Sequence, residues 1–438
     1  MRAMDARQGH GLTAEFLGSV GEDGAPARPA WTERGTPAYR RISAALFLAG
    51  FATFSLLYCV QPLLPAFTED FGVSPAESSL ALALSTGLLA LAILAAGALS
   101  QAVGRRGLMF ASLCGAALCN IAAGLAPGWH GLLIARALEG LALGGVPAVA
   151  MAYLAEEIHP RSLGLAMGLY VAGNAFGGMI GRVGIGALTE LTSWRMALIV
   201  LGGLGLAAAL GFIALLPASR NFAPRPGFDP KYHLRAWGGH LAHGGLPLLF
   251  LIGFLAMGAF VTVYNYAGFR LTAPPYGLGE TAISLIFTVY LFGIAASSAA
   301  GALADRLGRG PVLMAGTLVA AAGVALTLAH ALAGVIAGIV VLTIGFFMTH
   351  AVASGWVGRM AATAKGHAAS LYLLAYYLGS SVMGSVGGWF WSGGGWWAVA
   401  AFAGAMLAAA LAAAVRLRGI ERGAERRTDR VTVSSKEP

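Results

Sequence analysis

Residues 301–310, Gly-Ala-Leu-Ala-Asp-Arg-Leu-Gly-Arg-Gly, form a polar motif between two long apolar segments. The motif has an earlier copy, residues 97–106, with the sequence Gly-Ala-Leu-Ser-Gln-Ala-Val-Gly-Arg-Arg, at an offset of 204 residues. Residues 166–170 and 368–372 repeat more weakly, at an offset of 202. Two repeats with nearly the same offset in a chain of 438 residues predict two similar halves.

The composition around these motifs excludes a protein whose surface is covered by water. Hydrophobic residues make up 58% of the chain and charged residues only 11%, and the mean hydropathy is +0.74. Soluble domains carry about 25% charged residues. An ordinary cytosolic enzyme, a nucleic-acid binder and a disordered scaffold are therefore excluded, and long apolar runs predict membrane-spanning helices.

Twelve apolar segments are long enough to cross ~30 Å of hydrocarbon. Backbone hydrogen bonds in lipid must close within each segment, which predicts helices. The expected fold is an all-α integral membrane protein with twelve transmembrane helices in two six-helix, pseudo-symmetric bundles. The predicted spans are 42–66, 78–102, 108–126, 131–155, 163–187, 194–216, 246–268, 281–303, 311–329, 332–356, 368–391 and 395–415.

The longest polar segment between spans, residues 217–245, separates six spans from six. It predicts a linker between an N-terminal bundle, 42–216, and a C-terminal bundle, 246–415. Residues 1–41 lack the apolar region of a signal peptide and are expected to form a disordered N-tail. Residues 416–438 are expected to form a basic C-tail that fixes the topology against anionic lipid.

The positions of lysine and arginine predict the orientation of the chain. If both termini face the cytoplasm, 24 of the 28 basic residues lie on the inner side, and only Arg195 and Arg270 lie on the outer side. We therefore expect a multi-pass protein of the cell (inner) membrane with the linker and both termini in the cytoplasm. This distribution explains the net charge of +9 without nucleic acid, and the expected partner is the lipid bilayer.

Several motifs resemble those of the major facilitator superfamily, and together they span residues 42–415. The complete loop motif is at 301–309 and a degraded copy is at 97–106, while residues 132–140 resemble the fourth-helix motif with its intramembrane arginine. Residues 173–182 resemble the fifth-helix glycine motif of drug/proton antiporters, with Arg182 where that motif has proline. Together with residues 58–62 and 354–359, they resemble the YnfM-type branch of efflux proteins. The resemblance implies a transporter whose site lies between its halves, and a loop cluster that locks the cytoplasmic side.

The two loop motifs are the candidate cytoplasmic gate. Their glycines permit a tight turn between closely packed helices. Asp305 lies near the C-terminal end of its helix, where an anion needs a cationic partner. In the first copy Gln101 stands in the position of the acid, so that copy is expected to form a hydrogen bond but no ion pair. The alternative is that both loops only follow the positive-inside rule. The candidate gate residues are Gly97, Gln101, Gly104, Arg105, Arg106, Gly301, Asp305, Arg306, Gly308 and Arg309.

Three charged residues, Arg136, Glu139 and Arg182, lie inside predicted spans. Each costs at least ~2.5 kcal/mol to insert and should face a cavity or a partner. Arg136 and Glu139 share a helix face, and the helical rise places Glu139 and Arg182 roughly 12 Å and 9 Å from the same surface. Glu139 is therefore expected between two arginines. It either couples transport to protons, which requires one arginine to move away, or belongs to a static ion-pair network.

The remaining candidates are polar and aromatic residues of a substrate cavity. Aromatic walls suit amphipathic organic ligands or a cation, but tyrosines also anchor helices at membrane interfaces, and a lone histidine is often simply hydrogen-bonded. Gln61 precedes Pro62, whose backbone break predicts a hinge, a ligand contact or an ordinary helix end. The asparagines either line the cavity or join helices. The candidates are Gln61, Asn120, Asn174, Tyr264, Asn265, Tyr290, His350, Tyr372 and Tyr376.

These features predict a secondary active transporter that works by alternating access, with proton-coupled export of small organic compounds as the leading hypothesis. The alternatives are uptake of a sugar or organic anion by symport or facilitation and, with less support, a membrane-embedded enzyme or receptor. The spans hold no cluster of nucleophile, base or metal ligands, so no catalytic or metal site is expected. The chain has no ATP-binding loop, and we expect a proton gradient in place of a cofactor. The expected partner is a small-molecule substrate, without an obligate protein partner.

Overall fold

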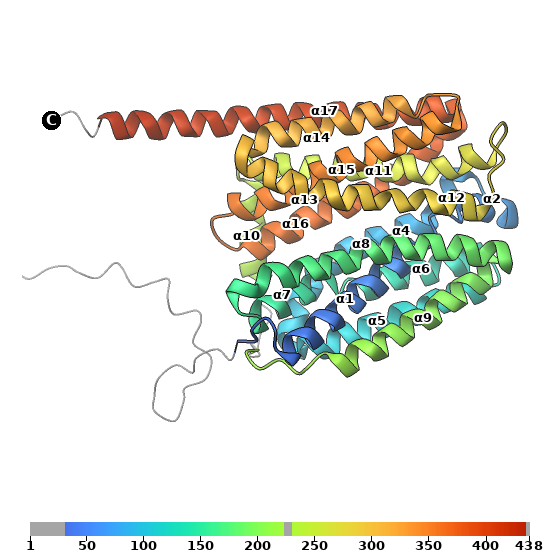
Figure 1. Ribbon diagram of the computed structural model, residues 1–438, viewed down its shortest axis with the longest axis horizontal. Coiled ribbons are helices and arrows are strands. Elements are labelled where there is room, and N and C mark those ends of the chain that lie inside the picture. The colour runs from blue at the N-terminus through green and yellow to red at the C-terminus, as the bar shows by residue number, and fades with distance from the viewer. Residues whose placement is uncertain (1–30, 223–229, 435–438) are drawn as a thin grey trace, which may run out of the picture.

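The computed structural model describes residues 31–222 and 230–434, apart from the side chains of residues 97–98, 101–103, 230 and 421–434. Within this part of the chain the fold is all-α, and the one β-bridge, between Thr32 and Ile158, is isolated. Figure 1 shows two groups of long helices that run side by side, the N-terminal half below and the C-terminal half above. Most of the predicted N-tail, residues 1–30, lies outside the described residues.

The helices follow the predicted order. The N-terminal half contains α1 (Pro37–Tyr58), α2 (Leu64–Phe71), α3 (Pro75–Ser78), α4 (Leu80–Val103), α5 (Arg105–Leu125), α6 (Trp129–Leu143), α7 (Pro147–Glu157), α8 (Pro160–Leu191) and α9 (Trp194–Leu215). The predicted linker contributes α10 (Pro230–Leu241). The C-terminal half contains α11 (Leu246–Thr272), α12 (Glu280–Leu285), the 3₁₀ turn η2 (Ile286–Val289), α13 (Tyr290–Leu307), α14 (Arg309–Leu326), α15 (Leu332–Met360), α16 (Lys365–Leu378), the π-helical turn η3 (Gly379–Met383) and α17 (Gly384–Ser434).

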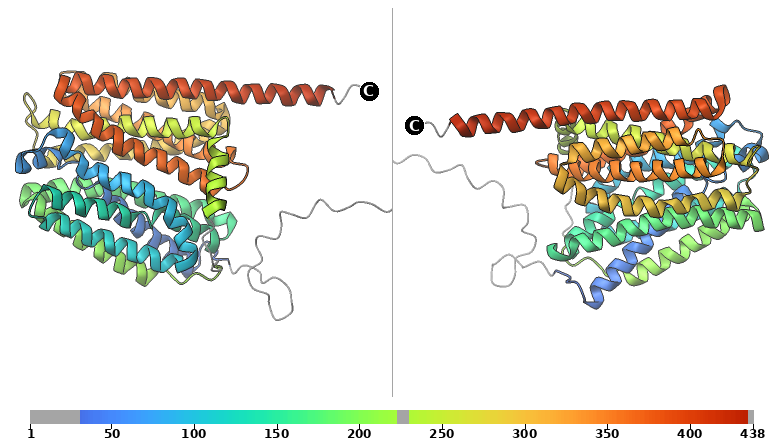
Figure 2. Two further views of the ribbon diagram at one scale, coloured as in Figure 1. Left: turned by 180° about the vertical axis from the view of Figure 1, so that it is seen from behind. Right: turned by 45° about the horizontal axis from the view of Figure 1, so that its top comes forward.

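Eleven helical stretches of the described chain are long and apolar enough to cross a membrane. The last of them, Lys365–Ile420, is 56 residues long and leaves helical geometry at Gly394 (φ −156°) and Gly395 (φ 57°). The chain doubles back there, as Figure 2 shows, so this stretch contains two crossings. The structure therefore has the twelve crossings that the sequence predicts.

The ends of the helices differ from the predicted boundaries where capping residues decide them. The first helix begins at Pro37, five residues before the predicted span, because the Thr36 side chain accepts a hydrogen bond of 3.2 Å from the Tyr39 amide. A proline in the first turn leaves no helical hydrogen bond unmade. Part of the predicted C-tail is also helical, since α17 continues to Ser434.

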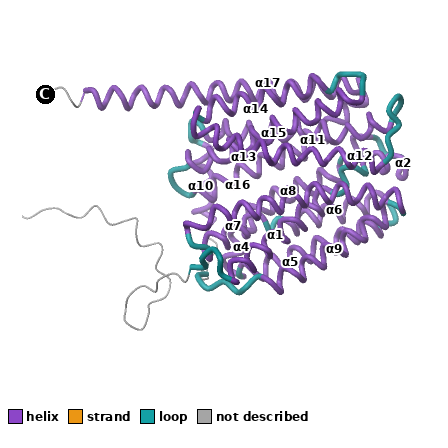
Figure 3. The backbone as a smooth tube through the Cα atoms, viewed as in Figure 1, coloured by secondary structure: helices purple, strands orange, loops and turns teal. Residues whose placement is uncertain are grey.

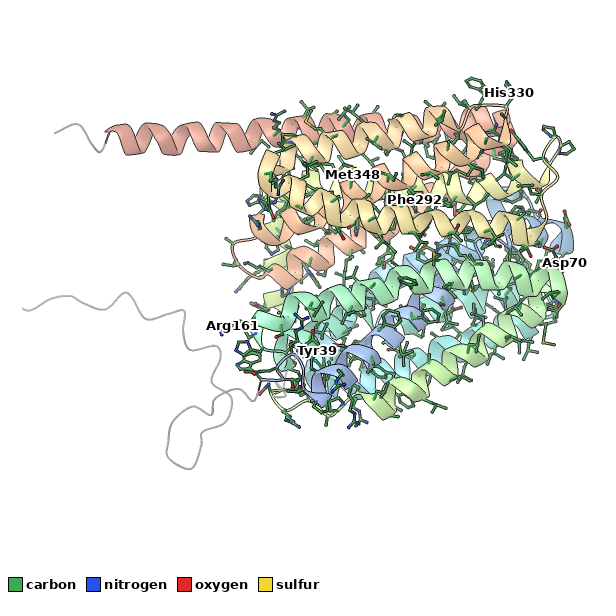
Figure 4. All side chains as sticks on the ribbon, in the orientation of Figure 1. Tyr39, Asp70, Arg161, Phe292, His330 and Met348 are labelled. Carbon is green, nitrogen blue, oxygen red and sulfur yellow. The ribbon has the colours of Figure 1, made fainter. Side chains whose placement is uncertain are left out.

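The loops and short helices gather at the two ends of the bundle, as Figure 3 shows. One end of the bundle holds the start of α1, the helix α10 and the C-terminal part of α17, and we call it the tail end. The opposite end holds α2, α3 and α12, and we call it the hairpin end. In Figure 4 Arg161 lies at the tail end and Asp70 at the hairpin end, while Phe292 and Met348 lie between them.

A stripe of glycines on α8 lets this helix approach α1 at backbone distance. Gly173, Gly177 and Gly181 are four residues apart, and a methyl group added at any of them would meet the α1 backbone, at Phe51 in the case of Gly177. The hydroxyl of Ser55 on α1 also donates a hydrogen bond of 2.9 Å to the Gly177 carbonyl oxygen. Small residues at this spacing are the usual means of close helix packing in lipid. The stripe brings Arg182, the next residue on α8, beside the end of α1.

The two halves are held together at the hairpin end. There the backbone amide of Thr281 donates a hydrogen bond of 3.0 Å to the Glu190 carboxylate, and the Ser381 hydroxyl donates one of 2.7 Å to the Ala83 carbonyl oxygen. At the tail end, Arg105 pairs with Glu156 within the N-terminal half, and Asp305 pairs with Arg309 and Arg359 within the C-terminal half. The bundle is therefore closed at the hairpin end.

Candidate functional site

A buried ion pair lies on α6 in the N-terminal half. Arg136 and Glu139 are both fully buried, and Nη1 of Arg136 lies 2.5 Å from Oε2 of Glu139. The guanidinium also donates to three backbone carbonyl oxygens, those of Ala81 at 3.1 Å, Leu56 at 3.2 Å and Leu57 at 2.6 Å. Arg136 thus joins α6 to the start of α4 and to the last turn of α1.

The end of α1 has free carbonyl groups because the helix breaks there. The chain leaves helical geometry after Cys59, and Pro62 has no amide hydrogen to donate back to the last turn. A guanidinium at this end satisfies the carbonyls and interacts favourably with the negative end of the helix dipole. The break that the sequence predicts at Gln61 and Pro62 is therefore also the place where the buried ion pair holds the first helix.

The surroundings of Glu139 differ from the expected ones in one respect. Its second oxygen, Oε1, has no hydrogen-bond partner among the described residues, and Arg182, expected to be its second arginine, forms no salt bridge with it. The expectation that Glu139 lies between two arginines is therefore wrong: helical rise gives depth in the membrane but not the direction in which a long side chain points.

Arg182 instead lies against the end of α1. Its Nε donates a hydrogen bond of 2.7 Å to Oε1 of Gln61, and its Nη1 donates one of 2.6 Å to the Gly178 carbonyl oxygen. The Arg182 side chain is only 2% exposed. The centre of the guanidinium lies 4.3 Å from the ring centroid of Tyr58, a contact within the cation–π range.

Two further rings reach the same guanidinium from the C-terminal half. Phe287 of η2 lies 4.9 Å away and Tyr290 of α13 lies 5.1 Å away, measured from the guanidinium carbon to the ring centroids. Sequence reasoning found Tyr290 but missed Tyr58 and Phe287. Neither has a local signal, because the three rings come from separate elements that meet only in the folded bundle.

Gln61 also links the two halves. Its amide nitrogen donates a hydrogen bond of 2.8 Å to Oδ1 of Asn265 on α11. Arg182, Gln61 and Asn265 therefore form one polar chain from α8 through the end of α1 to α11, and all three side chains are buried. Beside it the Tyr264 hydroxyl forms a hydrogen bond of 2.7 Å with Thr343.

A second group of predicted cavity residues lies between α15 and α16. Nδ1 of His350 is 2.9 Å from the Tyr372 hydroxyl oxygen, and the ring of Tyr376 is 4.6 Å from the His350 ring. The Phe346 ring lies 6.0 Å from the His350 ring, nearly parallel to it, and 6.3 Å from the Tyr376 ring. Phe346 also stacks on Phe260 of α11 at 3.9 Å, and Phe260 lies 5.8 Å from Tyr290, so ring contacts connect this group to the rings around Arg182.

The two predicted asparagines lie within the N-terminal half. Asn120 donates a hydrogen bond of 2.7 Å to the Leu198 carbonyl oxygen, and its own oxygen lies 3.5 Å from Nη1 of Arg136. It therefore joins α5 to α9 and supports the ion pair. Asn174 faces α1 at Gly50, where a methyl group would meet its side-chain oxygen. That oxygen has no hydrogen-bond partner among the described residues.

The loop motifs have the turn geometry that the sequence predicts. Gly104 and Gly308 lie between consecutive helices with φ values of 93° and 88°, which are strained for residues with a side chain. Asp305 has the expected cationic partners, since its Oδ1 lies 3.7 Å from Arg309 and 3.6 Å from Arg359. Two candidate gate positions, Gly97 and Gln101, are among the residues whose side chains the structure does not describe.

The first loop contains an ion pair that the sequence analysis excluded. Arg105 forms a two-pronged contact with the carboxylate of Glu156, with Nε donating to Oε2 at 2.5 Å. The acid comes from the last turn of α7 and not from the motif itself, where Gln101 stands. The expectation of no ion pair in this copy is therefore wrong, because it considered only the motif. The neighbouring Arg106 donates a hydrogen bond of 2.6 Å to the Ile213 carbonyl oxygen.

Comparisons with known proteins agree with this architecture. The family model described as Major Facilitator Superfamily matches residues 46–276 and 249–436. The inner membrane transport protein YnfM of Escherichia coli (strain K12) is 46% identical over 405 residues, which cover 90% of this chain and 97% of the relative. The uncharacterized MFS-type transporter YybF of Bacillus subtilis (strain 168) is 45% identical over 84% of this chain and 90% of its own.

Two more distant similarities add detail. The multidrug resistance protein MdtG of Proteus mirabilis (strain HI4320) is 33% identical over 187 residues, 41% of this chain and 44% of its own. A crystal structure of a bacterial homologue of the human lysosomal transporter Spinster, in an inward-facing and unoccupied conformation, shares the fold with a TM-score of 0.68 at 15% identity. It covers 87% of this chain and 95% of its own. The chain therefore belongs to the Major Facilitator Superfamily and is a multi-pass membrane transporter of the YnfM type, not an enzyme.

Proposed function

We propose that this transporter exports small organic or amphipathic compounds across the inner membrane by alternating access, in exchange for protons that bind at Glu139. The observation that carries the proposal is the geometry of this carboxyl group. Glu139 is fully buried, with Oε2 on Arg136 and Oε1 without a partner among the described residues. A buried polar atom without a partner is costly, and this oxygen is a place where a proton can be held inside the bundle.

The same geometry links the charge on Glu139 to the contact between the halves. Protonation removes the negative charge that Arg136 faces, while the guanidinium still holds the carbonyl oxygens of Leu56 and Leu57. Gln61, four residues after Leu57, joins α1 to Asn265 in the other half. A change in the position of Arg136 therefore acts on the helix end that carries the bridge to the C-terminal half.

The direction of transport is inferred from the orientation and from relatives. With both termini in the cytoplasm, as the positive-inside rule predicts, the hairpin end is the outer end, so the described state is closed to the outside. The glycine stripe on α8 resembles the motif of drug/proton antiporters, and one partial relative is named a multidrug resistance protein. The inner membrane is proposed because the Escherichia coli relative is an inner membrane transport protein by name.

The proposal is tested with purified protein in proteoliposomes that contain a pH-sensitive dye. Three probes represent the substrate classes: ethidium for amphipathic cations, benzoate for organic anions and glucose for sugars. Export by antiport predicts that ethidium, benzoate or both leave the compartment into which the imposed gradient drives protons, so that probe and protons move in opposite directions. Movement of glucose alone, or protons and probe moving in the same direction, contradicts the proposal in favour of symport. Failure of all three probes to move also contradicts it.

A further inference from the structure

We infer that Arg182 is the anchor for a negatively charged group of the substrate, and that the transported compounds therefore include aromatic carboxylates. The inference rests on the proposed transport function and names a substrate class for it. It starts from the charges inside the membrane. Arg136 is paired with Glu139, whereas Arg182 forms no salt bridge with any residue that the structure describes.

The groups around Arg182 stabilise its charge only in part. Both hydrogen-bond acceptors, the Gln61 amide and the Gly178 carbonyl, are neutral. A guanidinium does not lose its proton in proteins, so its charge persists when the side chain is buried. Burial removes the favourable hydration of an ion, and contacts with aromatic rings offset only part of this loss. Arg182 is therefore a permanent cation that an anionic ligand can stabilise further.

The position of Arg182 is that of a substrate site in a two-half transporter. Two of its three rings, Phe287 and Tyr290, belong to the C-terminal half, and Gln61 is bonded to Asn265 of the same half. When the halves separate at the hairpin end, the guanidinium loses these two rings and faces the space between the halves. Substrate sites of such transporters lie at the interface of the repeats.

The chemistry of the surroundings favours a flat acid. A carboxylate accepts two parallel hydrogen bonds from a guanidinium and carries the opposite charge, whereas the acceptor that Gln61 supplies is a single uncharged amide oxygen. An aromatic ring next to that carboxylate has the faces of Tyr58, Phe287 and Tyr290 to pack against. A quaternary or primary amine is excluded from the same place by like charge.

The test is equilibrium binding to the purified full chain in detergent, which requires neither a proton gradient nor transport. The probes are three matched pairs of acid and neutral amide: benzoate and benzamide, 2-naphthoate and 2-naphthamide, and indole-3-acetate and indole-3-acetamide. We expect the acid of at least one pair to bind at least tenfold more tightly than its amide, equivalent to ~1.4 kcal/mol. Absence of any preference for the acid overturns the inference.

Two variants locate the effect. Arg182→Gln removes the charge, and we expect it to abolish the preference for the acid while leaving the affinity for the amide within about twofold. Gln61→Glu keeps Arg182 and places a carboxylate where the amide oxygen now lies 2.7 Å from Nε. This internal acid competes with the ligand and should also lower the affinity for the acid about tenfold. It serves as the test if Arg182→Gln does not fold.

The remaining outcomes separate this inference from the proposed function. An acid preference that persists in both variants shows that the anion binds elsewhere and overturns the role of Arg182, even if transport is proton-coupled. Conversely, acid binding that depends on Arg182, together with transport that moves no protons, supports the anchor and contradicts the proposed antiport.

Discussion

The side-chain amide nitrogen of Gln61 lies 2.8 Å from the amide oxygen of Asn265, and this hydrogen bond joins the end of the first helix to the other half of the molecule. Both side chains are 2% exposed. On its other side Gln61 accepts a hydrogen bond from Arg182. One glutamine thus connects the interface between the halves to the cation that we assign to substrate binding.

Substitution of Asn265 by Leu should open the hairpin end. The change leaves the buried Gln61 amide without its acceptor, which costs the closed state ~1–3 kcal/mol and shifts the equilibrium between states about fivefold to a hundredfold. Spin labels at Leu191→Cys and Ala273→Cys, in a background that lacks the three native cysteines, should show a longer mean distance than in the same background with Asn265 intact. Thr343→Val is the matched control, because its hydrogen bond to Tyr264 stays within the C-terminal half. An unchanged distance in Asn265→Leu contradicts the role of the bridge.

The glycine stripe on α8 should be sensitive at one position and tolerant at another of the same helix. Gly177→Ala introduces a methyl group that meets the Phe51 carbonyl oxygen, whereas nothing lies within 4 Å of a methyl group at Gly184. Overpacking costs ~1–3 kcal/mol, while Gly→Ala in an open helix position is favourable by about 0.5–1 kcal/mol. We expect a lower melting temperature in detergent for Gly177→Ala and an equal or higher one for Gly184→Ala. Equal melting temperatures would show that α8 does not pack on α1 in this way.

The two loop ion pairs should differ in their contribution to stability. The Arg105 and Glu156 side chains are 8% and 29% exposed, whereas Asp305 and Arg359 are both 66% exposed. Exposed pairs contribute ~0–1 kcal/mol, but a largely buried arginine that loses a charged acceptor costs ~1–3 kcal/mol. Glu156→Gln should therefore lower the melting temperature more than Asp305→Asn does. Thermal unfolding of both variants in the same detergent decides the order, and the reverse order contradicts the assignment.

The sequence predicted the architecture well because the membrane imposes it. The lengths of the apolar segments predicted the twelve crossings, and the repeat of the loop motif at an offset of 204 residues predicted the two halves. The same reasoning placed Arg136, Glu139 and Arg182 inside the spans, since charge inside an apolar run is visible in the sequence alone, and the structure buries all three.

The partners of these residues were not predictable, because they depend on rotation about helix axes and on which helices meet. Helical rise placed Glu139 and Arg182 at similar depth, but Arg182 turns toward α1 and the C-terminal half. Glu156 could not be assigned to Arg105 from the motif, since the acid lies 51 residues further along the chain. The Tyr58 and Phe287 rings come together at Arg182 only when both halves are folded.

The central claim, that protons are exchanged through Glu139, is tested most directly by Glu139→Gln in proteoliposomes with an internal pH dye. The substitution keeps the size of the side chain but removes the group that takes up a proton. The matched control is Glu69→Gln, which removes an exposed carboxylate at the hairpin end. The account predicts that Glu139→Gln abolishes proton movement driven by the transported probe but retains exchange of probe across the membrane, while Glu69→Gln keeps both. Proton movement in Glu139→Gln at the wild-type ratio to probe would contradict the account.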